Sequence, residues 1–410
     1  MNYSKAFPSG LKFAFKRSKS PVAYTALTIK SGTRNEPEAF PGMAHMTEHM
    51  LFKGTVNRTP QEIDNCLELL GGDLNAYTAK EETVLFATVL KEDTERAVDL
   101  LMELAFQSTF PQKELDKERL VVIDEINMYK DSPSECIFED FENRLFGSHT
   151  LGRIILGTAA SLRKIKSNDI ISYVRENFTP DRMCISIVAD MAPQKAEEIA
   201  RKVMEKYIPS SLQSSGEYRT VSDVVGMPAF TEEISKKNHQ ANCIIGTTAY
   251  STYDDRRFSL ALLSNILGGP SSNSRLNQNL REANALVYAI DSIYTKYSET
   301  GSFMVYFGCE KGNVGKCLEK VAEELRKLRE ERIPASNLRA AKKQLLGQLA
   351  ISSDNGEAQA LALGKNMVVR GCLTTDEEIR AGYNSVTSAQ IQDIAADLLS
   401  PERLSTLIYK

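Results

Sequence analysis

The pattern of apolar and polar positions predicts a strand followed by a short buried helix near the N-terminus. Apolar and polar residues alternate from Val22 to Ser31, which is the period of a strand with one buried face. After Pro41 comes an apolar run, MAHMTEHMLFK, which Gly54 closes. Proline in the first turn and glycine just past the end commonly delimit a helix. We therefore expect a buried helix in this segment.

Further start and stop signals divide the rest of the first half into helices and strands. Thr59, Pro60 and Glu62 form a capping box with proline at the first helical position, and the helix that they begin ends before Gly71. A long helix is expected to end near Pro133, because the residue before a proline avoids helical geometry. The predicted strands are Leu74 to Thr78, Thr83 to Leu90 and Cys184 to Ala189, and the predicted helices include about Asp93 to Gln107 and Gln112 to Lys130, with a last helix after the third strand.

The same order of elements recurs in the second half of the chain, and such a repeat decides the fold class. Thr83 to Leu90 (TVLFATVL) matches Ser302 to Cys309 (SFMVYFGC) at an offset of 219 residues. Gln112 to Leu115 matches Ala335 to Leu338 at an offset of 223. We therefore expect an α+β protein of two homologous α/β-sandwich domains in tandem, each with an antiparallel-rich sheet and helices on one face.

The boundary between the two domains is expected in a Pro/Ser/Gly-rich segment without periodicity, IPSSLQSSGEY, from Ile208 to Tyr218. We predict a first domain at residues 1–209, a linker at 210–222 and a second domain at 223–410.

Composition is that of an ordinary globular protein and excludes several classes of partner. The 410 residues include 50 Lys and Arg and 54 Asp and Glu, and the net charge of −4 gives no reason to expect nucleic acid or an anionic membrane as a partner. Seven cysteines, widely spread and never paired as CxxC, argue against a disulfide framework and a thiolate zinc site. Because the chain has neither a signal-peptide pattern nor a membrane-length apolar stretch, we expect a soluble cytoplasmic protein, or a periplasmic one if a signal has been trimmed.

Candidate chemistry is concentrated in the first predicted helix. Two of the four histidines, His45 and His49, lie four residues apart, and Glu48 precedes the second. Residues i and i+4 share a helical face, so both imidazoles can reach one metal ion. This HxxEH motif inverts HExxH and supplies the same parts, two neutral imidazoles for Zn²⁺ and a carboxylate that takes a proton from the attacking water. Chance alone gives about 0.005 such matches in a chain of this composition.

A two-histidine site needs a third ligand, and the predicted helix from Gln112 to Lys130 offers Glu114, Glu118 and Glu125. Glu118 and Glu125 are two turns apart and share a face, whereas Asp124 points about 100° away. If Glu125 is the ligand, Glu118 is placed to hold the second ring nitrogen of a ligand histidine or to influence the bound water. The alternative for both carboxylates is an exposed, solvated helix face.

The motifs and their order resemble one family of peptidases. The chain contains, in order, His45 to His49 followed by MLFKGT, Gly71-Gly72, Asn75 to Thr78, Glu81, Glu125, Gly268-Gly269, Ser274 to Leu276, and Arg281 to Tyr288. This series resembles the pitrilysin/insulysin family of inverzincins, and most of all the short bacterial members related to the β subunit of the mitochondrial processing peptidase. The resemblance covers nearly the whole chain. One departure is Pro270, which follows the second glycine pair and touches no expected ligand.

The resemblance implies a role for each motif residue. One Zn²⁺ per chain would be held by His45, His49 and Glu125, with Glu48 as general base and Glu118 as a second carboxylate near the metal. Arg281 and Tyr288 would donate to carbonyl oxygens of the substrate, where a cation and a phenol can offset developing negative charge.

The resemblance also assigns Asn75 and Ala76 to contacts with the substrate. The segment Leu74 to Thr78 would then be an edge strand, to which an extended peptide adds through backbone hydrogen bonds. The alternative is an ordinary core strand. The two remaining histidines, His149 and His239, are expected to be structural or surface residues.

The second half lacks the metal-binding set. It contains no HxxEH, and at the offset of 223 Ala341 and Gln348 stand where the first half has Glu118 and Glu125. The resemblance implies that long family members join two halves of about this size around a closed chamber. We therefore expect a homodimer, or a heterodimer with a related subunit, in which the Arg/Tyr pair of one subunit completes the site of the other.

These inferences together predict a zinc-dependent metalloendopeptidase that hydrolyses unfolded peptides. Two alternatives stay open. One is a presequence-type processing peptidase, and the other is a non-catalytic core or scaffold subunit of the same family. Non-catalytic members typically lack part of the zinc set, whereas this chain has all of it.

Overall fold

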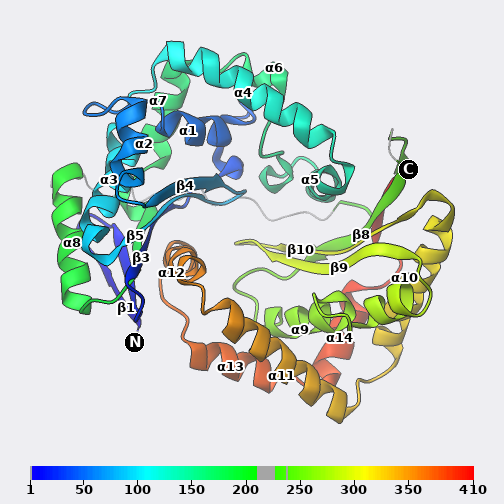
Figure 1. The fold of residues 1–410 in the computed structure, drawn as a ribbon. Coiled ribbons are helices and arrows are strands. Elements are labelled where there is room, and N and C mark those ends of the chain that lie inside the picture. The colour runs from blue at the N-terminus through cyan, green and yellow to red at the C-terminus, as the bar shows by residue number, and fades with distance from the viewer. Residues whose placement is uncertain (1, 210–226, 237–238) are drawn as a thin grey trace. The chain divides into compact units, whose positions relative to one another are not determined.

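The computed structural model describes residues 2–209, 227–236 and 239–410. The chain forms two compact units (Figure 1), of which the first comprises Met1–Asn127, Arg153–Thr220 and Ile351–Thr375, and the second Met128–Gly152, Val221–Ala350 and Asp376–Lys410. The linker predicted at 210–222 lies outside the described residues. Among the described helices, none combines the length and the apolar character that crossing a membrane requires.

The first unit is built on a six-stranded sheet in the order β1-β2-β6-β3-β5-β4. Strands β2 and β6 pair in parallel, and the other neighbours are antiparallel. Strand β4 pairs with β5 alone and forms one edge. The strands are β1 (Asn2–Ala6), β2 (Lys12–Arg17), β3 (Val22–Ile29), β4 (Asp73–Thr78), β5 (Thr83–Leu90) and β6 (Met183–Ala189).

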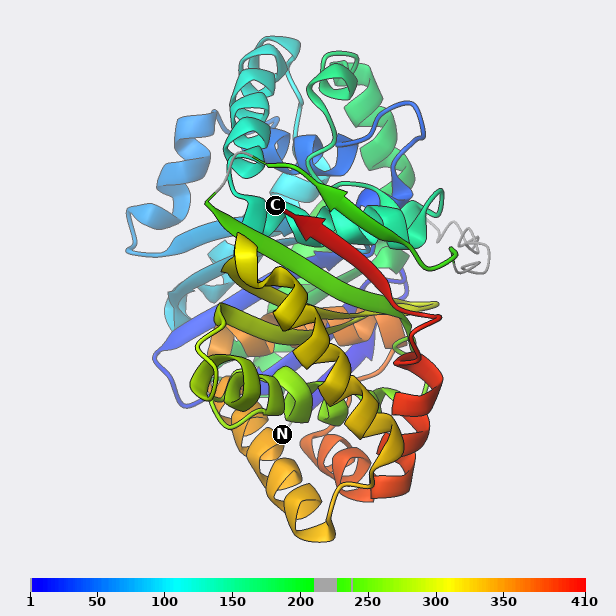
Figure 2. The ribbon, with the colours of Figure 1, turned by 90° about the vertical axis from the view of Figure 1, so that its right-hand side faces the viewer.

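The second unit is built on a five-stranded sheet in the order β7-β11-β8-β10-β9. Figure 2 shows β11 in red between the green strands β7 and β8. Its one parallel pair, β7 with β11, takes the place of β2 with β6 in the first sheet, so the two strand orders correspond and confirm the duplicated α+β fold. The strands are β7 (Thr231–Ile234), β8 (Gln240–Ala249), β9 (Val287–Lys296), β10 (Gly301–Glu310) and β11 (Ser405–Tyr409).

The helices begin at the signals that the sequence carries. Thr59 caps α2 with the expected capping box, and proline opens α2, α5 and α8. The helices are α1 (Met43–Leu51), α2 (Pro60–Glu68), α3 (Thr94–Gln107), α4 (Gln112–Lys130), α5 (Pro133–Phe146), α6 (Ala159–Leu162), α7 (Ser167–Asn177), α8 (Pro193–Tyr207), α9 (Arg257–Gly268), α10 (Val314–Glu330), α11 (Ala335–Ser352), α12 (Gly356–Arg370), α13 (Asp376–Ser385) and α14 (Ser388–Leu398).

Both faces of the first sheet are covered. Phe13 and Phe15 point to the face packed by α3 and α8, and Ala14 between them points to the face packed by α12. The expected layer of helices on one face is therefore joined by α12 on the other. Helix α12 approaches closely because Gly364 lies against β3, where a Cβ atom would be 2.1 Å from Thr28 Oγ1.

The second sheet is covered in the same way. Cys243 and Ile245 face a core formed with α9, α10 and α14, whereas Ile244 faces α5. Close packing on this side depends on Gly246, where a Cβ would lie 2.4 Å from Phe303 O and 2.9 Å from Phe141 Cε1. Alternating strand residues thus serve two separate layers of helices.

The two halves of the chain exchange equivalent helices. Helix α5, from the first half, belongs to the second unit, and α12, from the second half, belongs to the first unit. The first crossings follow Asn127 and Ala350, which are 223 residues apart, and the return crossings follow Gly152 and Thr375, also 223 apart. The offset found by comparing sequences is therefore also the offset of the exchange.

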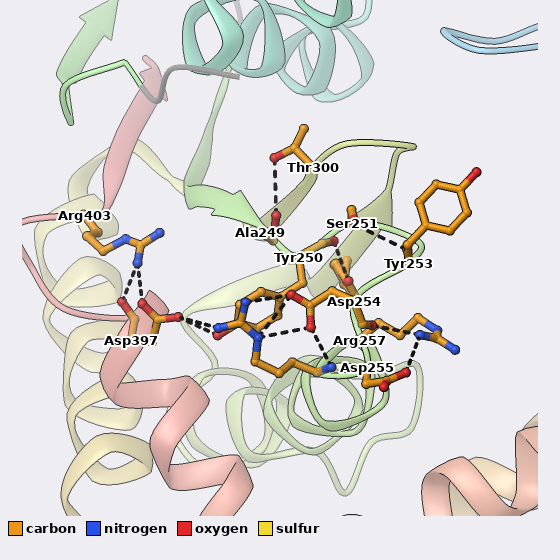
Figure 3. Close-up of polar contacts among 12 residues, drawn as sticks. Ala249, Tyr250, Ser251, Tyr253, Asp254, Asp255, Arg257, Thr300, Asp397 and Arg403 are labelled. Atoms are coloured by element: carbon orange, nitrogen blue, oxygen red, sulfur yellow. Dashed lines mark hydrogen bonds and ion pairs between the residues drawn. The ribbon is translucent and has the colours of Figure 1, made fainter. Parts of the chain in front are cut away.

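A polar network fixes the segment between β8 and α9 in the second unit (Figure 3). Tyr250 donates its hydroxyl to Asp397 at 2.6 Å, and the Arg256 guanidinium lies 4.0 Å from the centre of the Tyr250 ring. Arg256 also donates to Asp254 at 2.7 Å, and Arg403 donates to Asp397 at 2.6 Å. These contacts join the start of α9 to α14, which carries Asp397.

Candidate metal centre

Helix α1 begins where a buried carboxylate caps it. Glu36 accepts hydrogen bonds from the backbone N–H groups of Gly42 at 3.1 Å and Ala44 at 2.9 Å. These donors have no partner inside the helix, and the positive end of the helix dipole favours a carboxylate here. Burial raises the pKa of Glu36 to about 8, against the opposing effect of the two backbone donors. Arg153 donates to the Glu36 carbonyl oxygen and so holds the capping residue itself.

Helix α1 presents both histidines to one carboxylate on α4. His45 Nε2 lies 3.7 Å from Glu125 Oε1, and His49 Nε2 lies 3.6 Å from Glu125 Oε2. The two ring centroids are 4.6 Å apart, and one ligand atom from each of the three residues lies within 4.8 Å of the others. First-row ions with bonds of about 2.1 Å in tetrahedral geometry need ligand atoms about 3.4 Å apart. The three residues therefore fit a single metal ion.

The protonation state of His45 suits a ligand. Burial and the neighbouring His49 lower the pKa of His45 to about 3, so the imidazole is neutral at physiological pH. Its Nδ1 is buried and has no hydrogen-bond partner among the described residues. A neutral ring with a free lone pair is the form that binds metals.

His49 is oriented by a carboxylate and a lysine outside the ligand set. Glu118 Oε1 lies 2.9 Å from His49 Nδ1, and Lys53 Nζ lies 2.8 Å from Glu118 Oε2. Burial disfavours the charged ring, but the bond to Glu118 outweighs burial and raises the pKa of His49. Burial likewise opposes ionisation of Glu118, and the bonds from His49 and Lys53 lower its pKa. A carboxylate on Nδ1 fixes the tautomer that leaves Nε2 free for the ion.

Glu48 lies on α1 beside His49 without joining the ligand set. Its Oε2 accepts a hydrogen bond of 2.5 Å from Thr78 Oγ1 at the end of β4. Burial raises the pKa of Glu48, and the hydrogen bond from Thr78 opposes that shift. A carboxylate with a raised pKa next to a metal site has the properties of a general base.

The predicted edge strand is found, and it lies beside the metal-binding helix. Strand β4 packs against α1 and ends at Thr78. Asn75 is exposed and Ala76 is half-buried on this strand. The side of β4 away from β5 has no strand partner in the sheet. The backbone groups on that side are the kind to which an extended peptide can add.

The other sequence candidates lie outside this cluster. Glu114 pairs with Lys117 on the solvent side of α4, and Asp124 is exposed. His149 is 3.5 Å from Glu299 in the second unit, and His239 is exposed.

Arg281 and Tyr288 belong to the second unit. Arg281 is exposed in a short π-helix, Asn277–Glu282. Tyr288 is 53% exposed on β9, the edge strand that corresponds to β4. Their action on a substrate stays a prediction.

Three residues of the site carried no sequence signal of their own. Lys53 and Thr78 appeared only as letters of the family motifs, and Glu36 appeared in none. Each acts through a contact with a residue distant in the chain or through a helix end, which residue spacing does not report. Lys80, Glu81 and Arg153 are further polar groups near the start of α1 that only the fold brings together.

Comparison with known proteins follows this geometry closely. Residues 12–159 match the family described as Insulinase (Peptidase family M16), and residues 164–345 match the family described as Peptidase M16 inactive domain. The uncharacterized zinc protease YmxG of Bacillus subtilis is 31% identical over 385 residues, which cover 93% of this chain and 91% of that protein. The chain belongs to peptidase family M16. The resemblance found in the sequence is thereby confirmed.

Other family members extend this likeness. An uncharacterized zinc protease of Streptomyces coelicolor is 29% identical over 96% of this chain and 86% of that protein. The same fold occurs in a peptidase M16 inactive domain from Pseudomonas fluorescens, with a TM-score of 0.90 at 20% identity over 100% of this chain and 97% of that chain. It also occurs in a protease from Helicobacter pylori, with a TM-score of 0.89 at 20% identity over 100% of this chain and 99% of that one.

Proposed function

We propose that this M16 family member is a zinc-dependent metalloendopeptidase that hydrolyses unfolded peptides. The observation that carries the proposal is the convergence of the His45 and His49 ring nitrogens on the Glu125 carboxylate, with Glu48 on the same helix. Relatives that match nearly the whole chain are named zinc proteases. One such ligand set in the chain corresponds to one ion per chain.

The residues around the ion have separate tasks in this mechanism. A bound Zn²⁺ ion supplies Lewis acidity, which polarises a peptide carbonyl and lowers the pKa of a water. Glu48 accepts the proton of the attacking water at its carboxylate and returns it to the amine nitrogen that leaves. Glu118 keeps the proton of His49 on Nδ1, so that Nε2 remains a ligand.

We propose that the substrate binds as an extended strand along β4, contacting Asn75 and Ala76. The support is the edge position of β4 and its packing against α1. Recognition through backbone hydrogen bonds favours chains without folded structure and tolerates many side chains. Folded proteins should therefore be cleaved far more slowly than the same proteins after unfolding.

We also propose a division of labour between two homologous domains, 1–209 and 223–410, with the site completed in a homodimer. Arg281 and Tyr288 of the partner subunit would then donate to the substrate carbonyl oxygens inside a closed chamber. The support is the resemblance to longer family members and the lack of an HxxEH motif in the second half. Full peptidase activity in a monomer would contradict this assembly.

The direct test of the proposed function is hydrolysis of a mixed peptide library by the wild type and Glu48→Gln. We expect the variant to lose about 10²- to 10⁴-fold in turnover, the range that a general base contributes, while it retains its metal. Metal content is measured on both proteins. Glu114→Gln on α4 is the matched control and should keep wild-type activity, because Glu114 contacts only Lys117 among the residues discussed.

Two outcomes would overturn the proposal. Equal rates for the wild type and Glu48→Gln would exclude Glu48 as the base. A wild type that binds zinc but cleaves no peptide in the library would favour the non-catalytic alternative.

A further inference from the structure

The hydroxyl of Thr78 links the end of β4 to the proposed base. Thr78 Oγ1 donates to Glu48 Oε2 at 2.5 Å, although the two residues are 30 positions apart in the chain. Thr78 closes β4, and its backbone pairs with Thr83 on β5. The donor is therefore fixed to the sheet, whereas the acceptor is carried by α1.

The bond leaves the two oxygens of Glu48 in different environments. Oε2 is occupied by the threonine, and in the described part of the chain Oε1 accepts no hydrogen bond. A free carboxylate on a flexible stem rotates about its last torsion, which has a broad energy profile. A donor on one oxygen restricts that rotation and directs the other oxygen to one place. Proton transfer needs such a fixed approach, because a misplacement of about 1 Å can cost about 100-fold in rate.

The same threonine lies on the strand to which the substrate is proposed to add. Ala76 and Thr78 are two residues apart on β4, so their side chains lie on the same face of the sheet. A peptide that pairs with the edge of β4 orders this strand, and Thr78 passes that order to the carboxylate of Glu48.

We propose that Thr78 is a positioning residue, which orients the Glu48 carboxylate and couples the substrate-binding edge of β4 to the base. This inference rests on the proposed function. It assigns Thr78 no contact with the reacting atoms, because its hydroxyl is satisfied by Glu48.

The experiment compares Thr78→Val, which keeps the shape and removes the hydroxyl, with Thr78→Ser, which keeps the hydroxyl. We expect Thr78→Val to lower kcat about 10- to 100-fold, as the loss of an outer contact at a metal site does, and KM to change by less than about twofold. Thr78→Ser should stay within about threefold of the wild-type kcat. Zinc affinity, measured by chelator competition, should be the same in all three proteins, because Thr78 touches no ligand.

A second readout does not depend on turnover. Crystal structures of the metal-free proteins should show the Glu48 carboxylate in one orientation in the wild type and Thr78→Ser, and rotated or disordered in Thr78→Val. Thr83→Val is the matched control, because Thr83 also donates its hydroxyl across unit 1, to Ser31 O at 2.8 Å, without contacting Glu48. It should leave kcat unchanged. If Thr78→Val does not fold, Thr78→Ala takes its place with the same expectations.

The outcomes separate this inference from the proposed function. If Glu48→Gln is inactive and Thr78→Val has the wild-type kcat and the wild-type Glu48 orientation, the positioning role is wrong and the peptidase assignment stands. If the wild type and Glu48→Gln have equal rates, the proposed function fails. Loss of kcat in Thr78→Ser equal to that in Thr78→Val would also overturn the role of the hydroxyl.

Discussion

The two units share one arrangement of helices and strands but differ in the polar residues that join them. In the first, α1 packs on the edge strand β4, and its histidines meet Glu125 on α4. In the second, α9 packs on the edge strand β9, and Asn265 donates to Gln348 on α11 at 2.8 Å. Gln348 stands 223 residues after Glu125. A neutral amide pair thus occupies the place of the metal ligands.

The contact between helix and edge strand differs in the same way. Glu48 of α1 accepts from Thr78 of β4, whereas Ser264 of α9 lies 2.9 Å from Ser292 of β9. The second unit satisfies its polar groups internally, while the first keeps the buried His45 Nδ1 unpaired among the described residues. Unpaired or charged buried groups cost stability. The duplicated framework therefore persists with either set, and the costly set occurs where chemistry is proposed.

The largest expected effect comes from copying the second unit into the first. Glu125→Gln replaces an anionic ligand by a neutral amide, so zinc affinity should fall by more than the roughly 10- to 100-fold that outer contacts cost, and hydrolysis should be lost. Chelator competition and peptide hydrolysis measure both. The reverse change, Gln348→Glu, should create no metal site, because Asn265 is its only close partner on α9. Zinc binding by the second unit of that variant would contradict the comparison.

A smaller effect is expected where the exchanged helix α12 meets the first sheet. Gly364→Ala puts a Cβ atom 2.1 Å from Thr28 Oγ1, and overpacking of this kind costs about 1–3 kcal/mol of unfolding free energy. Gly347→Ala in α11, where the Cβ atom meets nothing within 4 Å, should stabilise by roughly 0.5–1 kcal/mol. Denaturant unfolding measures both. Equal effects of the two substitutions would show that close packing of α12 is unimportant.

The smallest effects concern the starts of α1 and α9 and have opposite signs with pH. The pKa of Glu36 is raised from 4.5 to about 8 by burial, with Arg153 and Lys80 among the charges nearby. The folded protein therefore holds a proton that the unfolded chain releases, and the unfolding free energy falls as pH rises between these two values. Glu36→Gln should flatten that dependence, and Glu38→Gln, at an exposed position, should not.

At α9 the Arg256 hydrogen bond lowers the pKa of Asp254. Its contribution is present at neutral pH and is lost as pH falls through the lowered value. The group is mostly solvated, so added salt should weaken the contribution. Unfolding midpoints of Asp254→Asn across pH measure it, and a loss on raising the pH would contradict the assignment.

Much of the fold could be predicted because its signals are local or repeated. The capping box at Thr59 and the limits of α4 were found as expected, and two matching segments indicated the duplication that the strand orders confirm. The exchange of α5 and α12 was not predicted. Helical periodicity shows that a face is apolar, but it does not show which of two similar sheets covers that face.

For the site, the sequence alone determined that His45 and His49 share one helical face with Glu48 beside them, because the pitch of a helix fixes that geometry. It narrowed the third ligand to carboxylates of α4. Only the tertiary structure decided that Glu125 faces both rings, that Glu118 and Lys53 hold His49, and that Thr78 reaches Glu48. These contacts join residues that packing, rather than helix pitch, brings together. Spacing along a chain determines geometry within one element, whereas contacts between elements depend on how whole faces bury one another.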